Sequence, residues 1–128
     1  MGCIFYPKVS IGENSVIGRQ CHLLGNITIK NNVSITAQTY IFSSSHHKNS
    51  PIFEAYTIPV VIEDYAWIGA RAMILPGVNI GKGAILGAGS TATRSMDDYS
   101  ICVGVPAKVV GRRSELLTYE LDYFPYFQ

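Results

Sequence analysis

Three histidines and a single tryptophan are the side chains of this chain best suited to chemistry near neutral pH. A neutral imidazole can remove a proton from a hydroxyl group, and His46 stands directly before His47. Adjacent side chains leave an extended strand in opposite directions, so these two do not point together at one metal ion. The third histidine, His22, stands well apart from both in the sequence. The spacing argues against a zinc site, and we interpret His22 as structural.

A six-residue repeat of aliphatic residues must position these side chains. Twelve of thirteen repeat positions hold Ile, Leu or Phe. They are Phe5, Ile11, Ile17, Leu23, Ile29, Ile35 and Ile41, then Ile62, Ile68, Ile74, Ile80 and Leu86, with Ala92 as the exception. A period of six is neither that of a helix nor that of an alternating strand. It predicts an all-β solenoid, a triangular prism of three short strands per turn whose turns stack about 4.8 Å apart.

The repeat is interrupted once, between Ile41 and Ile62, which are 21 positions apart. We interpret this interval as one turn of three hexads plus three further positions, with a loop emerging within 47–61. Turns are then expected at 5–22, 23–40, 41–58, 62–79 and 80–97. On this count Trp67 stacks one turn from His46, and a histidine, an aromatic plate and a loop at one corner predict a pocket. The alternative is a polar corner residue beside a surface tryptophan that covers a neighbouring subunit.

The C-terminal part of the chain loses the repeat and is expected to cap the prism. We predict one domain over 1–128, with prism turns at about 5–103 and a cap or tail at 104–128. The apolar spacing within 114–122 predicts a short helix with Ser114 as its N-cap. Such a helix would pack on the prism or on a neighbouring subunit.

Composition restricts the class of partner. A net charge of +1 argues against nucleic acid as a main ligand. We find no apolar stretch of the roughly 18 residues that a membrane span needs, and no signal peptide. The three cysteines are interpreted as reduced thiols. Together these features predict a cytoplasmic protein.

Two stretches, 62–90 and 104–111, resemble the hexapeptide-repeat acyltransferases, which are left-handed parallel β-helix enzymes. Within that superfamily the residues at 43–46, 50–53 and 58–64 are most similar to the sugar O-acetyltransferases of exopolysaccharide synthesis, the colanic-acid type. Galactoside, maltose, nodulation-factor and xenobiotic acetyltransferases are closely related members of this superfamily. The resemblance implies a left-handed coil, acetyl-CoA as cosubstrate, no required metal, and a homotrimer with each active site between two prisms.

The same resemblance implies roles for individual residues. His46 matches the catalytic histidine that ends a hexad before the protruding loop, and Trp67, His47 and Glu54 are expected at the acceptor site. The expected coenzyme contacts are Ala70, Ala88, Thr93, Arg94, Lys108 and Arg112, the last four being ordinary solvated surface in the alternative interpretation. For the mechanism we expect a backbone N–H near the corner formed by Trp67, Ile68 and Gly69 to stabilise the oxyanion. Relatives commonly carry Asp in place of His47 and a longer N-terminal region, so the acceptor pocket departs from the family pattern.

The leading hypothesis is an acetyl-CoA-dependent O-acetyltransferase that acts on a sugar or polysaccharide precursor by direct transfer. Two alternatives remain: acetylation of a xenobiotic or an amino sugar, and a β-helix scaffold without catalytic activity. Binding of coenzyme A would separate the scaffold from both enzymes.

Overall fold

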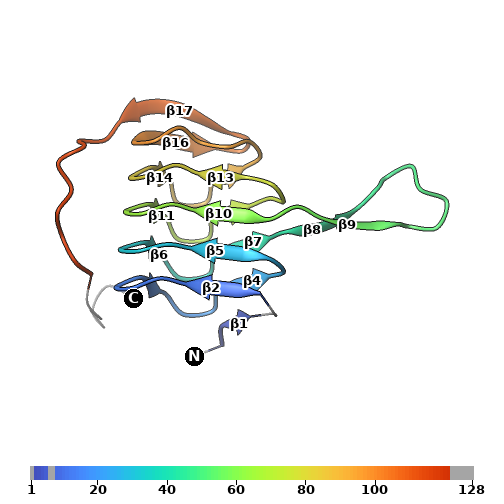
Figure 1. Cartoon of the computed structure of the whole chain (residues 1–128). Coiled ribbons are helices and arrows are strands. Elements are labelled where there is room, and N and C mark those ends of the chain that lie inside the picture. Colours follow the sequence, from blue (N-terminus) through green and yellow to red (C-terminus); the bar gives the residue numbers. More distant parts are fainter. Residues whose placement is uncertain (1, 6–7, 122–128) are drawn as a thin grey trace.

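The chain winds into a triangular prism whose three sides are parallel sheets (Figure 1). The computed structural model describes residues 2–5 and 8–121, and it contains strands but no helix in these ranges. We call the sheets face A, face B and face C in the order in which the chain meets them. Face A holds β1 (Ile4–Phe5), β4 (His22–Leu24), β7 (Tyr40–Phe42), β12 (Met73–Ile74) and β15 (Thr91–Ala92). Face B holds β2 (Val9–Ile11), β5 (Ile27–Ile29), β10 (Val60–Ile62) and β13 (Asn79–Ile80). Face C holds β3 (Val16–Ile17), β6 (Ser34–Ile35), β11 (Trp67–Ile68), β14 (Ile85–Leu86), β16 (Ser100–Gly104) and β17 (Ala107–Arg112).

The repeat positions point inward and form the core. From Leu23 onward every leading aliphatic residue of a hexad is buried, as is Ala92. In the first turn Ile11 is still 40% exposed, because the prism ends there. Each Ile or Leu that leaves water contributes roughly 1.5–3 kcal/mol, so stacked turns stabilise one another.

One residue with positive φ turns the chain at most corners. At the corner between faces C and A, the C/A corner, these residues are Gln20, Gln38, Arg71 and Gly89. Gly69 precedes this corner, and a Cβ there would collide with the backbone nitrogen of Ala88 in the next turn. A glycine at this position therefore lets successive turns stack closely.

Successive turns pair in a register of three hexads, as between Ile11 and Ile29. Across the third turn the register is longer, because Ile29 pairs with Ile62. The excess is an insertion that forms an arm, residues 44–58, in which β8 (Ser44–His46) pairs antiparallel with β9 (Ala55–Thr57). Figure 1 shows this arm projecting sideways from the prism.

The predicted count across the interruption is wrong. Ile41 and Ile62 lie on neighbouring faces A and B of the same turn, so the interval between them is one hexad plus the inserted arm. The expected turn boundaries at 41–58, 62–79 and 80–97 are displaced accordingly. An interval of 21 positions fits one turn plus three positions, and it also fits one hexad plus an inserted arm. Only the strand pairing decides between these two divisions. The sequence predicts a loop within 47–61, whereas the observed arm spans 44–58 and its pairing begins at Ser44.

The predicted C-terminal helix is also wrong over its described part, residues 114–121. The chain instead turns back after β16 and pairs β17 antiparallel to it. It then descends along the corner between faces B and C, the B/C corner (Figure 1). There Nη1 of Arg113 donates to the Tyr65 carbonyl at 2.9 Å, and the Leu121 N–H donates to Asn32 Oδ1 at 3.3 Å. Contacts with the prism replace helical hydrogen bonds in a segment too short to nucleate a helix well by itself.

Candidate active site

His46 is the last residue of β8, and Phe53 holds its ring from the other side of the arm. The Nδ1 atom lies 2.8 Å from the Phe53 carbonyl oxygen, and the two rings stack with centroids 3.7 Å apart. A carbonyl oxygen only accepts hydrogen bonds, so Nδ1 carries the proton and neutral imidazole keeps its lone pair on Nε2. The side chain is exposed. His46 therefore presents the tautomer that a general base requires.

His47 and Glu54 lie beside His46 at the outer end of the arm. The His47 N–H donates to the Glu54 carbonyl at 2.8 Å, and His47 Nε2 is 4.0 Å from Glu54 Oε1. The His47 ring also packs on Tyr56 at a centroid distance of 4.7 Å. This exposed contact is an ion pair only when His47 is protonated, and such a pair contributes little stability. Three of the four residues predicted for catalysis and acceptor binding thus lie on the arm, where His47 contacts Glu54 and His46 contacts Phe53.

Trp67 does not join them within one chain. It lies on β11 in face C, where it pairs with Ser34 and Ile85, and 47% of it is exposed. The predicted stacking of Trp67 on His46 is wrong, because the arm leaves the prism at the corner between faces A and B, the A/B corner.

The backbone around Trp67 is already engaged. Its N–H donates to the Ala84 carbonyl at 2.9 Å, and the Gly69 N–H donates to the Leu86 carbonyl at 2.7 Å. These bonds stack one turn on the next. The N–H groups of Trp67 and Gly69 are thus engaged in stacking, and an oxyanion donor elsewhere near this corner stays a prediction.

Ala70 and Ala88 occupy one column of the C/A corner, one turn apart. The Gly89 N–H donates to the Ala70 carbonyl at 2.8 Å, which fixes the stacking of these two turns. The two alanines border a hollow of about 680 Å³, which we call the corner hollow. Its other lining residues are Arg19, Gln20, Ala37, Gln38, Arg71 and Gly89. Small side chains in this column leave room for an extended ligand along the corner.

The other predicted coenzyme residues lie elsewhere on the prism. Thr93 and Arg94 are exposed and follow β15, at the A/B corner. Lys108 and Arg112 are exposed on β17, which closes the top of face C. Nη2 of Arg112 lies 3.9 Å from Oε2 of Glu115.

The predicted site residues therefore fall into two sets. The arm set belongs to the A/B corner and comprises His46, His47, Glu54, Thr93 and Arg94. The groove set belongs to face C and the C/A corner and comprises Trp67, Ala70, Ala88, Lys108 and Arg112. The third corner is covered by the chain's own C-terminal segment. One chain by itself does not bring the two sets together.

Sequence reasoning missed two features near these sets. One is Phe53, which orients His46 and which the sequence places only within the stretch 50–53 that is similar to the sugar O-acetyltransferases. A row of hydrogen-bonded side chains, Gln20, Gln38 and Arg71, follows the C/A corner. When the arm is left out of the hexad count, Gln20, Gln38 and Arg71 occupy equivalent positions of successive turns. This equivalence is the signal in the sequence that predicts the row.

Among residues 2–5 and 8–121, no three His, Cys, Asp or Glu side chains are grouped as metal ligands. No helix long and apolar enough to cross a membrane occurs in the same ranges.

Comparison with known protein families gives a match to the bacterial transferase hexapeptide model (six repeats) over residues 1–43 and 59–94. The gap in this match, residues 44–58, is the arm. The repeats that match are thus the turns of the prism, and the arm is an addition to them.

Several named proteins are similar to this chain. A putative colanic acid biosynthesis acetyltransferase of Escherichia coli is 34% identical over 115 residues, which cover 88% of this chain and 63% of that protein. A maltose O-acetyltransferase structure from Clostridium difficile superposes with a TM-score of 0.80 at 30% identity, covering 85% of this chain and 61% of that one. A mutant of the N-acyltransferase AntD from Bacillus cereus, in complex with dTDP-4-amino-4,6-dideoxyglucose and coenzyme A, gives a TM-score of 0.82 at 29% identity, covering 88% and 67%. The chain spans less than two thirds of the length of the colanic acid relative.

Proposed function

Because the chain belongs to the bacterial transferase hexapeptide family, we propose that it transfers the acetyl group of acetyl-CoA to a hydroxyl group of a sugar or polysaccharide precursor. Family membership also implies that the coil is left-handed. The observation that carries the proposal is the geometry of His46, whose Nδ1–H is held by the Phe53 carbonyl while Nε2 keeps its lone pair. Similarity to the colanic acid and maltose acetyltransferases supports a sugar hydroxyl as the acceptor.

The proposed reaction is a direct transfer. Nε2 of His46 takes the hydroxyl proton as the acceptor oxygen attacks the acetyl carbonyl carbon. The new C–O bond forms and the C–S bond breaks, so coenzyme A leaves as a thiolate. The imidazolium then returns its proton to the thiolate sulfur. The proposed transfer requires neither a metal ion nor an acyl-enzyme intermediate.

The coenzyme is proposed to lie in the corner hollow, along Ala70 and Ala88. The thin column of alanines suits an extended pantetheine arm, and the AntD relative binds coenzyme A. Trp67 would border the acyl end, and Lys108 and Arg112 on β17 would be near the charged nucleotide. The free cysteines among the described residues fit a reducing compartment, and we place the enzyme in the cytoplasm.

A homotrimer is proposed because each chain carries two halves of a site on different corners. In a cyclic assembly the A/B corner of one chain can lie against the C/A corner of the next. The arm would then carry His46 across to the neighbour's Trp67 and corner hollow. Three equivalent sites would form, each from two chains.

Transfer to an amino group is the second candidate. The AntD relative was crystallised with an amino sugar nucleotide, and a neutral amine is a better nucleophile than a hydroxyl group. The same histidine and corner hollow would serve that reaction.

The test is isothermal titration with acetyl-CoA, followed by an acetyl-transfer screen on polysaccharide repeat units, nucleotide sugars and amino sugar nucleotides. We expect micromolar binding of acetyl-CoA and an O-acetylated product that is labile to mild base. An amide product, stable to base, would favour the second candidate. Absence of acetyl-CoA binding would overturn both and favour a scaffold.

A further inference from the structure

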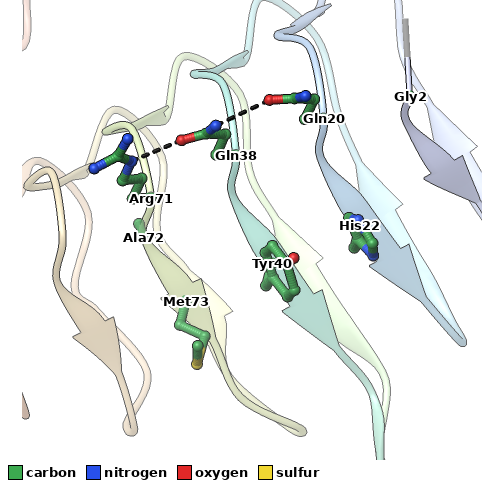
Figure 2. A pocket seen from close by; sticks show the side chains of 8 residues that line it. All are labelled: Gly2, Gln20, His22, Gln38, Tyr40, Arg71, Ala72 and Met73. Atoms are coloured by element: carbon green, nitrogen blue, oxygen red, sulfur yellow. Dashed lines mark hydrogen bonds between the residues drawn. The ribbon is translucent and has the colours of Figure 1, made fainter.

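Two parallel rows of side chains cross face A beside the C/A corner (Figure 2). The outer row is Gln20, Gln38 and Arg71, and the inner row is His22, Tyr40 and Met73. Both rows follow from the stacking of turns, since His22 pairs with Tyr40 and Tyr40 with Met73. They line a hollow of about 570 Å³, which we call the face A hollow.

The outer row is held in place by hydrogen bonds between side chains. Nε2 of Gln38 donates to Oε1 of Gln20 at 2.9 Å, and Nε of Arg71 donates to Oε1 of Gln38 at 2.6 Å. Figure 2 shows the two terminal nitrogens of Arg71 pointing away from Gln38. Within the described residues these nitrogens donate no hydrogen bond, so a planar pair of charged donors is already oriented for a ligand.

The inner row offers polar ring edges. The rings of His22 and Tyr40 stack on each other with centroids 4.4 Å apart and planes 8° apart. Their faces are therefore turned toward each other, and both side chains line the face A hollow. In the described part of the chain neither the Tyr40 hydroxyl nor the His22 ring makes a hydrogen bond, so both can bind hydroxyl groups of a ligand.

The charged side chains that line the face A hollow and the corner hollow are all positive. Arg71 lines both the face A hollow and the corner hollow, and Arg19 lines the latter. Neither set of lining residues includes Asp or Glu. An exposed arginine fixed by neighbours, with no carboxylate among the lining residues, is suited to a phosphate or carboxylate group.

We propose that the face A hollow binds an anionic sugar, with Arg71 on its phosphate or carboxylate and the edges of Tyr40 and His22 on its hydroxyl groups. This inference rests on the proposed function, because it names the class of acceptor. The face A hollow shares Gln20, Gln38 and Arg71 with the corner hollow, so an acceptor held there lies next to the proposed coenzyme.

The experiment compares the wild-type chain with Arg71→Gln by calorimetric titration with glucose 6-phosphate, glucuronate, glucose and acetyl-CoA. Glutamine is tolerated at this corner, since Gln20 and Gln38 occupy the equivalent positions with positive φ. Lys82→Gln is the matched control, because it removes one exposed positive charge at the B/C corner.

We expect at least one of the two anionic sugars to bind at least tenfold more tightly than glucose. Arg71→Gln should weaken that binding by about tenfold to a hundredfold, the usual worth of charge-assisted hydrogen bonds. Arg71 also lines the corner hollow, so the affinity for acetyl-CoA is measured in the same variant and should fall less than the affinity for the anionic sugar. Lys82→Gln should leave all four ligands unaffected. A response to glucose 6-phosphate alone would assign a phosphate group, and a response to glucuronate alone a carboxylate.

Equal affinity for charged and neutral sugars would overturn the inference, as would the absence of binding by any sugar. Loss of acetyl-CoA affinity in Arg71→Gln with unchanged sugar binding would assign Arg71 to the coenzyme and also overturn it. These titrations need no turnover, so a protein without acetyltransferase activity can still support the anion site. Conversely, acetylation of neutral sugars alone would leave the proposed function intact and reject this inference.

Discussion

The prism and the arm of this molecule follow different physical rules. In the prism, buried aliphatic residues recur every six positions, and each turn is paired with the turns below and above it. The arm has two antiparallel strands, and most of its residues are exposed, including Ile52 at 79% and Phe53 at 69%. An isolated two-stranded hairpin is marginally stable in water. The prism therefore supplies most of the stability of the molecule. The arm carries the candidate base and exposes apolar side chains that another surface could cover.

This contrast explains why the candidate chemistry lies outside the repeats. Every inward position of the prism is occupied by core packing, and the corners are constrained by stacking hydrogen bonds. A histidine on an inserted hairpin escapes both constraints and can reach beyond its own prism. The family match, which covers the turns and omits residues 44–58, divides the chain at the same boundary.

The largest effect is expected at the arm. His46→Gln removes the base but keeps a polar side chain, so kcat should fall by about 10²–10⁴ while acetyl-CoA affinity stays unchanged. Steady-state kinetics beside calorimetric titration would measure both quantities. Near-full activity of this variant would show that the arm does not carry the base.

A complementation experiment tests whether arm and prism work across two chains. His46→Gln disables the arm set, and Ala70→Trp should fill the corner hollow and disable the groove set. Co-refolded at equal concentration, two inactive variants should recover about a quarter of wild-type activity, because random cyclic assembly pairs intact halves in that share of sites. No recovery from variants that each form trimers by light scattering would place both halves in one chain.

The stability of the two regions can be compared with the same substitution. Ile68→Ala in the prism core should lower the free energy of unfolding by about 2–5 kcal/mol, because Ile68 is fully buried. Ile52→Ala in the arm should change it by less than about 0.5 kcal/mol. Urea denaturation monitored by circular dichroism gives both values. Similar losses would mean that the arm belongs to the cooperative core.

The smallest effect concerns the cysteines of the prism. Burial, and secondarily the neighbouring Cys3, raises the pKa of the Cys21 thiol, so less of the reactive thiolate is present at a given pH. Cys3 is partly exposed and should be alkylated first, and Cys21 and Cys102 only slowly. Mass spectrometry after brief iodoacetamide treatment at mildly alkaline pH would show the order. Equal rates at Cys3 and Cys21 would indicate that the first turns of the prism open readily.

Sequence alone predicted the prism well, since a period of six over thirteen positions admits few other solutions. It also indicated His46, His47 and Glu54 as site residues; all three lie on the arm, where His47 contacts Glu54, and their roles stay predictions. It failed for the helix after Ser114, because contacts of Arg113 and Leu121 with the prism outweigh local helix propensity. Those contacts join segments that are far apart in the chain, which a local pattern does not register.

The repeat by itself determined which side chains point inward, because the hydrophobic effect favours the same positions in each hexad; burial is complete only from Leu23 onward. Only the tertiary structure decided how the interval from Ile41 to Ile62 is divided, because strand pairing selects between two counts that the spacing allows equally. That choice moved Trp67 to face C, away from His46, and placed Arg71 in line with Gln38 and Gln20. The core is thus a property of local periodicity, whereas the site depends on which distant turns become neighbours.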